Sequence, residues 1–337
     1  MTHQVRIEGT DHQFDVGDDE SVIDAALRAG LMLPYSCRSG TCGTCKGDIV
    51  EGAIAYPDGL PPAIDAKEDA AGKALFCQAR PASDLLIRVA EVREAGAIQP
   101  QRLPARVEHI EEVAPDVRRL FLKLPRDKRL AFLAGQYLDI LLRGGQRRSF
   151  SLANAPHDDE RLELHVRHLP GGVFSEYVFT GLQPGALLRF EGPLGNFFLR
   201  EDSDRPMILM GGGTGFGPIK GIVEHALHLG VTRPMHVYWG ARAQADLYLD
   251  SLPREWAARH PSVLYTPVLS EPARDTAWEG ATGFVHEQVL NDHPDLSGFD
   301  VYMSGPPPMI NAAREAFTSA GLPAERLFYD SFEPGGD

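Results

Sequence analysis

The 337-residue sequence lacks the features that mark several large classes of protein. It has no apolar run near the roughly 20 residues that a membrane-spanning helix requires. Positively charged residues are also few: there are 33 lysines and arginines against 47 aspartates and glutamates. The resulting formal charge of −14 argues against binding to nucleic acid or to an anionic membrane surface. There is no internal repeat and no low-complexity segment, so the sequence is typical of a folded globular protein, with the length of two or three domains.

Cysteine is scarce as well, and the positions of its four copies are informative. Cys37, Cys42 and Cys45 follow a C-x4-C-x2-C spacing, and Cys77 comes after 31 intervening residues. This is the spacing of plant-type 2Fe-2S clusters, in which cysteine thiolates hold the iron atoms. The glycines between the cysteines let the backbone approach an inorganic core closely and adopt positive φ. The spacing therefore predicts that these four cysteines are the ligands of a 2Fe-2S cluster.

Three alternative roles for the cysteines stay open at this point. Disulfides are disfavoured because residues 1–4 lead straight into a strand pattern with no signal peptide, which also predicts a cytoplasmic protein. Structural zinc ribbons usually pair two C-x2-C knuckles, whereas here one such pair faces the lone Cys77. Four unrelated buried thiols would not produce this spacing. The iron–sulfur interpretation is the one that the pattern favours.

The first part of the chain, residues 1–93, has the pattern of a small α+β unit. Residues 4–8 and 13–16 alternate as two strands, and Ser21 with Asp24 resembles a helix capping box. A further strand over residues 85–89 closes the sheet. Residues 94–101 are small, polar and proline-containing, which is the composition of a linker.

The rest of the chain shows two further patterns. Residues 102–201 contain short strands separated by Gly and Pro turns, which predicts an antiparallel barrel or sandwich. Residues 202–337 alternate apolar strands with helical segments, which predicts a doubly wound parallel sheet. The expected strands in this last part are 206–210, 235–239, 263–266 and 301–303, and the expected helices are 219–229, 251–259, 283–291 and 308–320.

A glycine-rich turn over Gly211–Pro218 follows the first of these apolar strands. Such a turn lets a pyrophosphate approach the amides at a helix N-terminus, although a purely structural turn stays possible. Two more strand ends, at Arg242 and at Ser304–Met309, point to the same crevice. The acidic Asp246 suits a ribose diol better than a 2′-phosphate and so favours NADH over NADPH, unless it is only a solvated loop carboxylate.

Two segments of the middle domain suit a flavin. In Arg147–Leu152, Arg148 supplies a cation for phosphate, Phe150 an aromatic plane for the ring, and Ser151 a hydroxyl near the flavin N5. A second turn with exposed amides, Gly171–Ser175, follows shortly after. On composition alone, Arg148 is equally consistent with a surface cation.

Taken in order, these motifs resemble the ferredoxin–NAD(P) reductase superfamily. More narrowly, the chain is similar to reductase components that carry an N-terminal plant-type ferredoxin domain. These serve aromatic-ring oxygenases, such as phenol hydroxylase and naphthalene dioxygenase, or the deoxygenation of sugar nucleotides, as in the CDP-6-deoxy-Δ3,4-glucoseen reductases. The resemblance covers essentially the whole chain, in the same domain order.

The resemblance implies a β-grasp-like ferredoxin domain over residues 1–93, an FAD-binding barrel over 102–201 and an NAD-binding α/β domain over 202–337. It implies that electrons pass from NADH, with NADPH possible, through FAD and the 2Fe-2S cluster to an acceptor protein. That acceptor is an oxygenase component, its ferredoxin, or a deoxysugar dehydratase. No nucleic acid and no membrane span is expected.

The motifs and the resemblance together name the expected site residues. Flavin contacts are expected from Arg148, Ser149, Phe150, Ser151, His165, Val166, Arg167, Gly171, Gly172, Val173 and Ser175. Nucleotide contacts are expected from Gly213, Thr214, Gly215, Pro218, Arg242, Asp246, Gly305 and Pro306. The hydride-transfer position is expected beside Ser151, Thr214, Ser304 and Phe332.

Two positions depart from the family pattern. Ser304 stands where the family commonly has cysteine, which is expected to alter nicotinamide placement or to slow hydride transfer. Phe150 replaces the commoner tyrosine, so ring stacking survives while the phenol hydrogen bond is lost. Two other functions also fit the residues: a redox sensor that does not turn over, and a zinc-stabilised flavoprotein that passes hydride directly to a small substrate.

Overall fold

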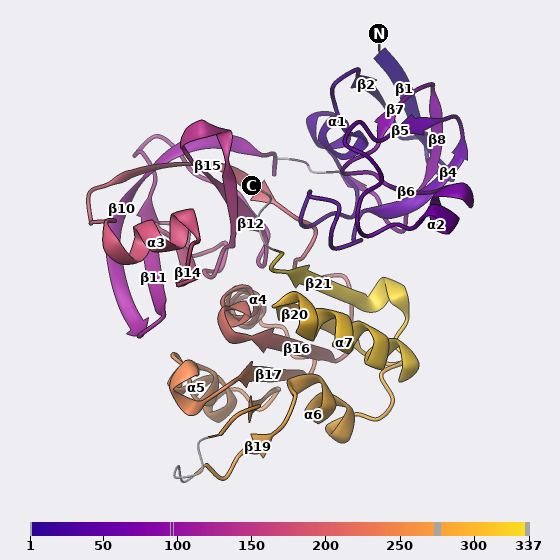
Figure 1. The fold of residues 1–337 in the computed structure, drawn as a ribbon. Coiled ribbons are helices and arrows are strands. Elements are labelled where there is room, and N and C mark those ends of the chain that lie inside the picture. Colours follow the sequence, from indigo (N-terminus) through magenta and orange to yellow (C-terminus); the bar gives the residue numbers. More distant parts are fainter. Residues whose placement is uncertain (1, 95, 97, 273–277, 334–337) are drawn as a thin grey trace. The chain divides into compact units, whose positions relative to one another are not determined.

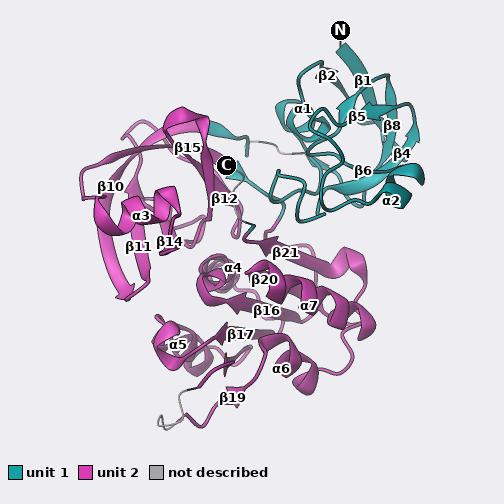
Figure 2. Ribbon diagram, viewed as in Figure 1, with its two compact units in different colours: residues 1–101, 193–196, 333–337 teal, residues 102–192, 197–332 magenta. Residues whose placement is uncertain are grey.

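The computed structural model describes most of the chain and divides it into two compact units (Figures 1 and 2). The described residues are 2–94, 96, 98–272 and 278–333. The first unit contains those of residues 1–101 together with 193–196 and 333, and the second contains 102–192 and those of 197–332. None of the helices in the described part is long and apolar enough to cross a membrane.

The first unit is built on a five-stranded sheet beside one helix. Ser21 begins helix α1 (Val22–Arg28) by accepting a hydrogen bond from the amide of Asp24, as the capping pattern predicts. The last strand, β8, lies in the middle of the sheet, parallel to β1 and antiparallel to β4, rather than at the edge where a closing strand would lie. The sheet order is β2 (Gln13–Gly17), β1 (Thr2–Ile7), β8 (Leu85–Arg88), β4 (Lys46–Glu51) and β6 (Lys73–Leu75).

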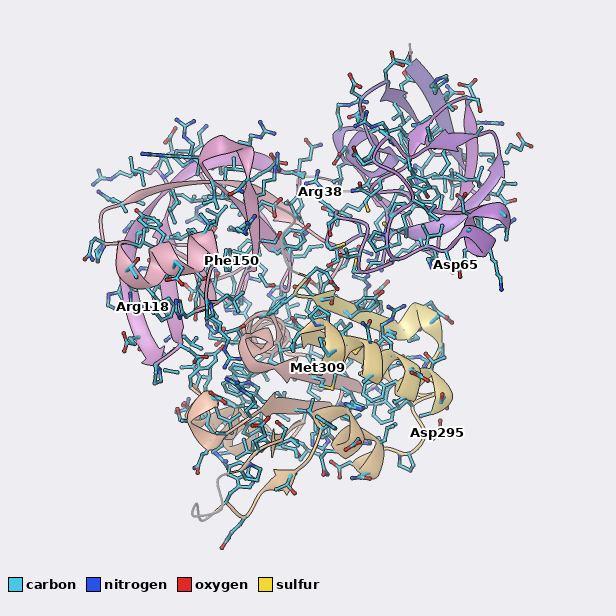
Figure 3. The ribbon with its side chains drawn as sticks, viewed as in Figure 1. Arg38, Asp65, Arg118, Phe150, Asp295 and Met309 are labelled. Carbon is cyan, nitrogen blue, oxygen red and sulfur yellow. The ribbon has the colours of Figure 1, made fainter. Side chains whose placement is uncertain are left out.

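Smaller elements complete the first unit. The short helix α2 (Ala66–Ala70) is capped by Asp65, which is labelled in Figure 3. Two two-stranded sheets pair β3 (Leu31–Met32) with β9 (Arg93–Glu94), and β5 (Ile54–Ala55) with β7 (Arg80–Pro81). The expected linker, 94–101, includes residues 95 and 97, which lie outside the described residues.

The first half of the second unit is a six-stranded sheet. A bridge between Leu152 and Leu164 joins its two end strands, and this closes the sheet into the expected barrel. Apolar residues fill the interior, including Leu120, Leu138 and Val166. The strand order is β13 (Arg147–Ser151), β12 (Tyr137–Leu141), β15 (Leu187–Leu194), β10 (Gln101–Ala114), β11 (Val117–Lys123) and β14 (Leu162–Arg167), followed in the chain after β14 by helix α3 (Val173–Thr180).

The second half is the predicted doubly wound parallel sheet. Alternate residues of β16 (Met207–Gly212) face opposite layers: Met207 and Leu209 pack with helices α4 and α5, while Ile208 and Met210 pack with α6 and α7. The strand order is β19 (Ala281–Thr282), β18 (Val263–Leu269), β17 (Met235–Ala241), β16, β20 (Asp300–Gly305) and β21 (Leu327–Ser331). The helices are α4 (Phe216–His228), α5 (Ser251–Arg259), α6 (Val285–Asp292) and α7 (Pro307–Ser319), as labelled in Figure 1.

Candidate functional site

The four cysteine side chains meet in the first unit as free thiols. Cys37 is half-buried and the other three are buried. The loop and its flanks place donors against the sulfurs: the amide of Cys42 lies 3.4 Å and the hydroxyl of Thr41 3.5 Å from Cys37 Sγ. As a thiol, Cys42 Sγ donates to the hydroxyl of Thr44 at 3.3 Å, and the same hydroxyl can donate to the thiolate. Groups of this kind stabilise negative charge on thiolate ligands.

The thiols lie close enough to interact in two pairs, Cys37 with Cys42 and Cys45 with Cys77. Two thiolates for each of two irons is the arrangement that a 2Fe-2S cluster requires. A structural zinc ion instead needs four donors that converge on one point. The pairing fits a two-iron cluster.

The thiols are held in unequal protonation states. The hydrogen bond from Cys42 lowers the pKa of Cys37 to about 4. The same hydrogen bond, with burial, raises the pKa of Cys42, and the bond to Cys77, with burial, raises that of Cys45. Since ligands bind iron as thiolates, loading of the cluster must release protons from the buried thiols.

The conformation of the thiol loop depends on positive φ angles. Arg38 has φ 56°, Gly40 φ 78° and Gly43 φ 76°. A Cβ on Gly40 would lie 2.8 Å from the side chain of Pro61, so only glycine fits there. Two contacts hold Arg38, which is labelled in Figure 3. The side-chain amide of Gln78 donates to the carbonyl of Arg38 at 2.7 Å, and the guanidinium forms an ion pair with Asp24. Backbone strain at a non-glycine residue is typical of functional loops.

The flavin motif lies on β13, at one end of the strand order of the barrel in the second unit. Phe150, labelled in Figure 3, is half-buried, and its ring centroid lies 5.1 Å from that of Phe174. The neighbouring arginines differ: Arg147 pairs with Asp139 and Glu191, whereas Arg148, among the residues described, has no carboxylate partner and donates only to the carbonyl of Arg147. An uncompensated cation beside an aromatic ring fits the phosphate of a flavin nucleotide.

Ser151, at the end of β13, is bonded to a residue that the sequence did not single out. Its hydroxyl donates to Asp330 Oδ2 at 2.7 Å, and Asp330 is buried. In the parallel ladder of β20 and β21, Asp330 pairs with Ser304. Phe332 lies two residues further along, and its amide donates to the carbonyl of Gly305 at 3.0 Å. The expected flavin residue and the expected hydride-transfer residues therefore meet at one junction.

The second flavin turn opens helix α3. Gly171 has φ 78°, and within the described residues no side chain caps the first turn of α3, so its free amides are available to an anion. Ser175 is buried, and its hydroxyl bonds to the amide and carbonyl of Leu169 and to the carbonyl of Gly172. The exposed Val173 lies at the start of the helix. In this structure Ser175 stabilises the turn itself.

The three consecutive residues at the end of β14 point in different directions. His165 is buried between Glu163 and Tyr248, and Val166 belongs to the apolar interior of the barrel. Arg167 pairs with Asp116 at 2.9 Å and faces the nucleotide turn, because a Cβ on Gly213 would lie 2.9 Å from its guanidinium. Their side chains therefore pack on protein groups, and their contact with a flavin stays a prediction.

The glycine turn joins β16 to α4 as the sequence predicts. A Cβ on Gly215 would lie only 2.1 Å from the carbonyl oxygen of Ser304, so the turn touches the end of β20. Similarly, a Cβ on Gly212 would lie 2.5 Å from the sulfur of Met309 and 3.1 Å from Pro306. Such close approach of backbones is the use that dinucleotide turns make of glycine. Thr214 is half-buried in this turn, and Pro218 is buried in the first turn of α4.

Ser304 is buried at 0% exposure, and within the described residues its hydroxyl has no hydrogen-bond partner. A buried hydroxyl without a partner is costly unless a ligand satisfies it. It lies between the glycine turn and Asp330, where the nicotinamide is expected. The position fits a cofactor amide or ring.

Asp246 lies between two arginines in the short helical turn that follows β17. Its carboxylate accepts from the amide of Ala243 at 3.1 Å, and its oxygens lie 3.7 Å from Arg167 and 3.9 Å from Arg242. Arg242 is exposed. The carboxylate is therefore ordered by its neighbours rather than freely solvated.

Comparisons with known proteins find three domain families along the chain. Residues 5–82 match the 2Fe-2S iron-sulfur cluster binding domain, residues 104–199 the oxidoreductase FAD-binding domain, and residues 209–315 the oxidoreductase NAD-binding domain. The three cofactors expected from the sequence, a 2Fe-2S cluster, FAD and NAD, are confirmed.

Full-length relatives have the same organisation. The CDP-6-deoxy-L-threo-D-glycero-4-hexulose-3-dehydrase reductase of Yersinia pseudotuberculosis is 41% identical over 99% of both chains. The phenol 2-monooxygenase reductase component of a Pseudomonas species is 35% identical over 100% of this chain and 96% of the relative. The crystal structure of an Amycolatopsis cytochrome P450 reductase is 37% identical, covers 99% of both chains and has a TM-score of 0.84. The fold class is therefore confirmed, and the chain belongs to the iron–sulfur flavoprotein reductases of the ferredoxin–NAD(P) reductase superfamily.

Proposed function

We propose that this reductase takes electrons from NADH and delivers them one at a time to a separate acceptor protein. The observation that carries the proposal is the hydrogen bond from Ser151 to Asp330, which is itself paired with Ser304. Ser304 in turn touches the nucleotide turn at Gly215, so this contact places the flavin strand close to that turn. FAD, when bound, accepts a hydride and gives up electrons singly, which is the chemistry that the junction needs.

The chain's own residues hold and orient the flavin. Phe150 would provide the surface on which the ring stacks, and Arg148 with the free amides of α3 would neutralise the pyrophosphate. The hydroxyl of Ser151 donates to Asp330, which would fix the Ser151 side chain beside the flavin and leave its oxygen free to accept a hydrogen bond. The proposed flavin residues remain Arg148, Ser149, Phe150, Ser151, His165, Val166, Arg167, Gly171, Gly172, Val173 and Ser175.

The nucleotide lies across the carboxyl ends of the parallel strands. The turn at Gly213–Gly215 holds the pyrophosphate, and Ser304 lies against the nicotinamide. Asp246 accepts from the ribose diol and repels a 2′-phosphate, so NADH is preferred over NADPH. The other residues proposed for this site are Pro218, Arg242, Gly305, Pro306 and Phe332.

The four thiolates hold the cluster from which electrons leave the protein. The relatives are reductases of a hexulose dehydrase, a phenol monooxygenase and a terephthalate dioxygenase. By this likeness the acceptor here is an oxygenase component or a dehydratase. Because free thiols and NADH are both kept in the cytoplasm, we place the protein there. The domain limits 1–93, 102–201 and 202–337, with a linker at 94–101, are part of the same proposal.

The variant Cys42→Ser tests this order of transfer. Loss of one ligand removes the cluster, so reduction of a one-electron protein acceptor is expected to fall to background, while NADH-dependent reduction of ferricyanide through the flavin stays near the wild-type rate. Asp11→Ala, at an exposed position between β1 and β2 of the same unit, is the control and is expected to keep both activities. Equal loss of both activities with flavin still bound would contradict the proposed order.

The class of acceptor is tested with purified partners. An oxygenase component and a sugar-nucleotide dehydratase are each mixed with the reductase and NADH, and turnover of the partner is followed. Turnover of one and not the other assigns the class. Turnover of neither, with cytochrome c still reduced, would contradict both assignments.

A further inference from the structure

A chain of buried polar contacts connects the flavin barrel to the nucleotide-binding sheet within the second unit. Glu163 and His165 lie on β14, at 4% and 7% exposure. His165 Nε2 lies 2.8 Å from Glu163 Oε1, and His165 Nδ1 lies 2.9 Å from the hydroxyl of Tyr248. Tyr248 belongs to the segment that follows β17, so this contact joins the two halves of the unit.

The protonation states of these three side chains decide which group donates in each hydrogen bond. Burial raises the pKa of Tyr248, so its hydroxyl stays a donor. Burial opposes ionisation of Glu163, but His165, Lys220 and Arg119 outweigh it and lower the pKa, so Glu163 is an acceptor. Burial lowers the pKa of His165, which is therefore neutral. It follows that Tyr248 donates to Nδ1 of His165, and that Nε2–H of His165 donates to Glu163.

On the nucleotide side, Tyr248 is connected to the dinucleotide turn through Trp239. The two rings meet edge to face at 5.1 Å. Trp239 stacks on Phe216, the first residue of α4, with ring centroids 3.9 Å apart, and its indole nitrogen donates to the carbonyl of Gly213 at 3.0 Å. Movement of Tyr248 would therefore move the residues that begin the turn.

The start of helix α4 also rests directly on His165. A Cβ on Gly217 would lie 3.2 Å from His165 Nδ1, so the helix backbone touches the imidazole. One turn along, Lys220 Nζ lies 3.0 Å from Glu163 and 3.1 Å from the carbonyl of Ala153. The ion pair and the imidazole together fix the first turns of α4 against the barrel.

We infer that His165 and Tyr248 are positioning residues for hydride transfer, because their contact sets the dinucleotide turn against the flavin barrel. The inference rests on the proposed function. Hydride transfer needs its reacting atoms about 3–3.5 Å apart, and a displacement of about 1 Å can cost roughly 100-fold in rate. A contact that joins the two halves beside the turn controls that distance without taking part in the chemistry.

The variant Tyr248→Phe removes only the hydroxyl and leaves the ring against Trp239. Tyr265→Phe is the matched control, since its hydroxyl donates to Asp250 at 2.7 Å within the nucleotide-binding half. For each holoenzyme we would follow flavin bleaching by stopped flow at saturating NADH and with NADH deuterated at the transferred position. Tyr248→Phe is expected to slow flavin reduction about tenfold, with an unchanged dissociation constant for NADH and a larger isotope effect, whereas Tyr265→Phe matches the wild type.

A double variant tests whether the two residues act together. If they form one contact, His165→Gln combined with Tyr248→Phe will be no slower than the slower single variant. Additive losses would contradict a shared role. Rates of flavin reduction in Tyr248→Phe equal to those in Tyr265→Phe, or loss of flavin from Tyr248→Phe, would overturn the inference.

Failure of the proposed function would look different. In that case the wild-type flavin would be reduced by dithionite but not by NADH. The inference fails instead when NADH reduces wild type and Tyr248→Phe at the same rate.

Discussion

The two units of this reductase build their sites in opposite ways. In the first, three of the four thiols come from the nine residues Cys37–Cys45, and the loop that holds them is fixed largely by its own glycines. In the second, the groups that meet lie far apart in sequence: Ser151 and Asp330 are 179 positions apart, and His165 and Tyr248 are 83 apart. A local site tolerates changes elsewhere, whereas an assembled site depends on how its strands and helices pack.

The largest effect is expected where the assembled site is tightest. Gly215→Ala would place a Cβ 2.1 Å from the carbonyl of Ser304, so the backbone must shift, at a cost of about 3 kcal/mol. We expect flavin reduction by NADH to fall more than tenfold, while the iron–sulfur spectrum stays unchanged. The control is Gly298→Ala, because a Cβ there meets nothing within 4 Å. Loss of the cluster in Gly215→Ala would contradict the independence of the two sites.

The corresponding change in the local site is Gly40→Ala. Alanine there carries the strain of φ 78°, about 1–2 kcal/mol, and also meets Pro61 at 2.8 Å. Gly59→Ala has the same kind of strain at φ 89° but meets nothing within 4 Å. Iron content is expected to fall in Gly40→Ala and to stay nearly complete in Gly59→Ala, with NADH-to-ferricyanide activity kept in both. Equal iron loss in the two variants would show that strain, and not the contact with Pro61, is decisive.

A smaller effect is expected on the choice of nucleotide. Asp246→Ala removes a carboxylate and leaves Arg167 and Arg242 beside the ribose site. A change of about 1.4 kcal/mol in the interaction of the site with the 2′-phosphate changes the preference between NADPH and NADH tenfold. The ratio of kcat/KM for NADPH to that for NADH is expected to rise by about this factor. Glu255→Ala, which removes an exposed carboxylate on α5, is expected to leave the ratio unchanged.

The smallest effect is expected on the stability of the second unit in acid. Burial, with the neighbouring His293, lowers the pKa of His236 to about 4. The unfolded chain takes up this proton near pH 6.5. The associated stability is therefore complete above pH 6.5 and is lost as the pH falls toward 4, by less than about 1.4 kcal/mol per pH unit because the ring is partly exposed. The Tm is expected to fall less steeply over this range in His236→Gln than in the wild type; identical slopes would show that His236 does not contribute.

The local thiol site could be predicted from the sequence, whereas the assembled site of the second unit could be predicted only in part. The thiol spacing needs only neighbouring residues to be recognised, and the alternation of strands and helices gives the fold class, with α5 at the predicted 251–259. Helix α3 was missed because it is short and follows a glycine pair that is typical of a turn. β10 extends over Gln101–Ala114 and is longer than the short strands expected in this part of the chain, with two bulges in its pairing with β11.

The residues that hold the assembled site were beyond such reasoning. Asp330 lies in a short apolar strand near the end of the sequence, and Lys220 is one charge on a helix. Their importance comes from partners on other elements, Ser151 and Glu163, and no spacing along the chain encodes those contacts. Glycines such as Gly217 gave a partial signal, since close packing on another element is one reason for glycine in a helix.

Electron transfer from NADH through FAD to the cluster is tested most directly by an anaerobic titration of the holoenzyme with NADH, followed by visible absorption and low-temperature EPR. We predict that the flavin bleaches and that a rhombic signal of a reduced 2Fe-2S cluster appears as electrons move on from the flavin. Absence of iron from the purified protein, or bleaching with no EPR signal at full iron occupancy, would contradict this order of transfer.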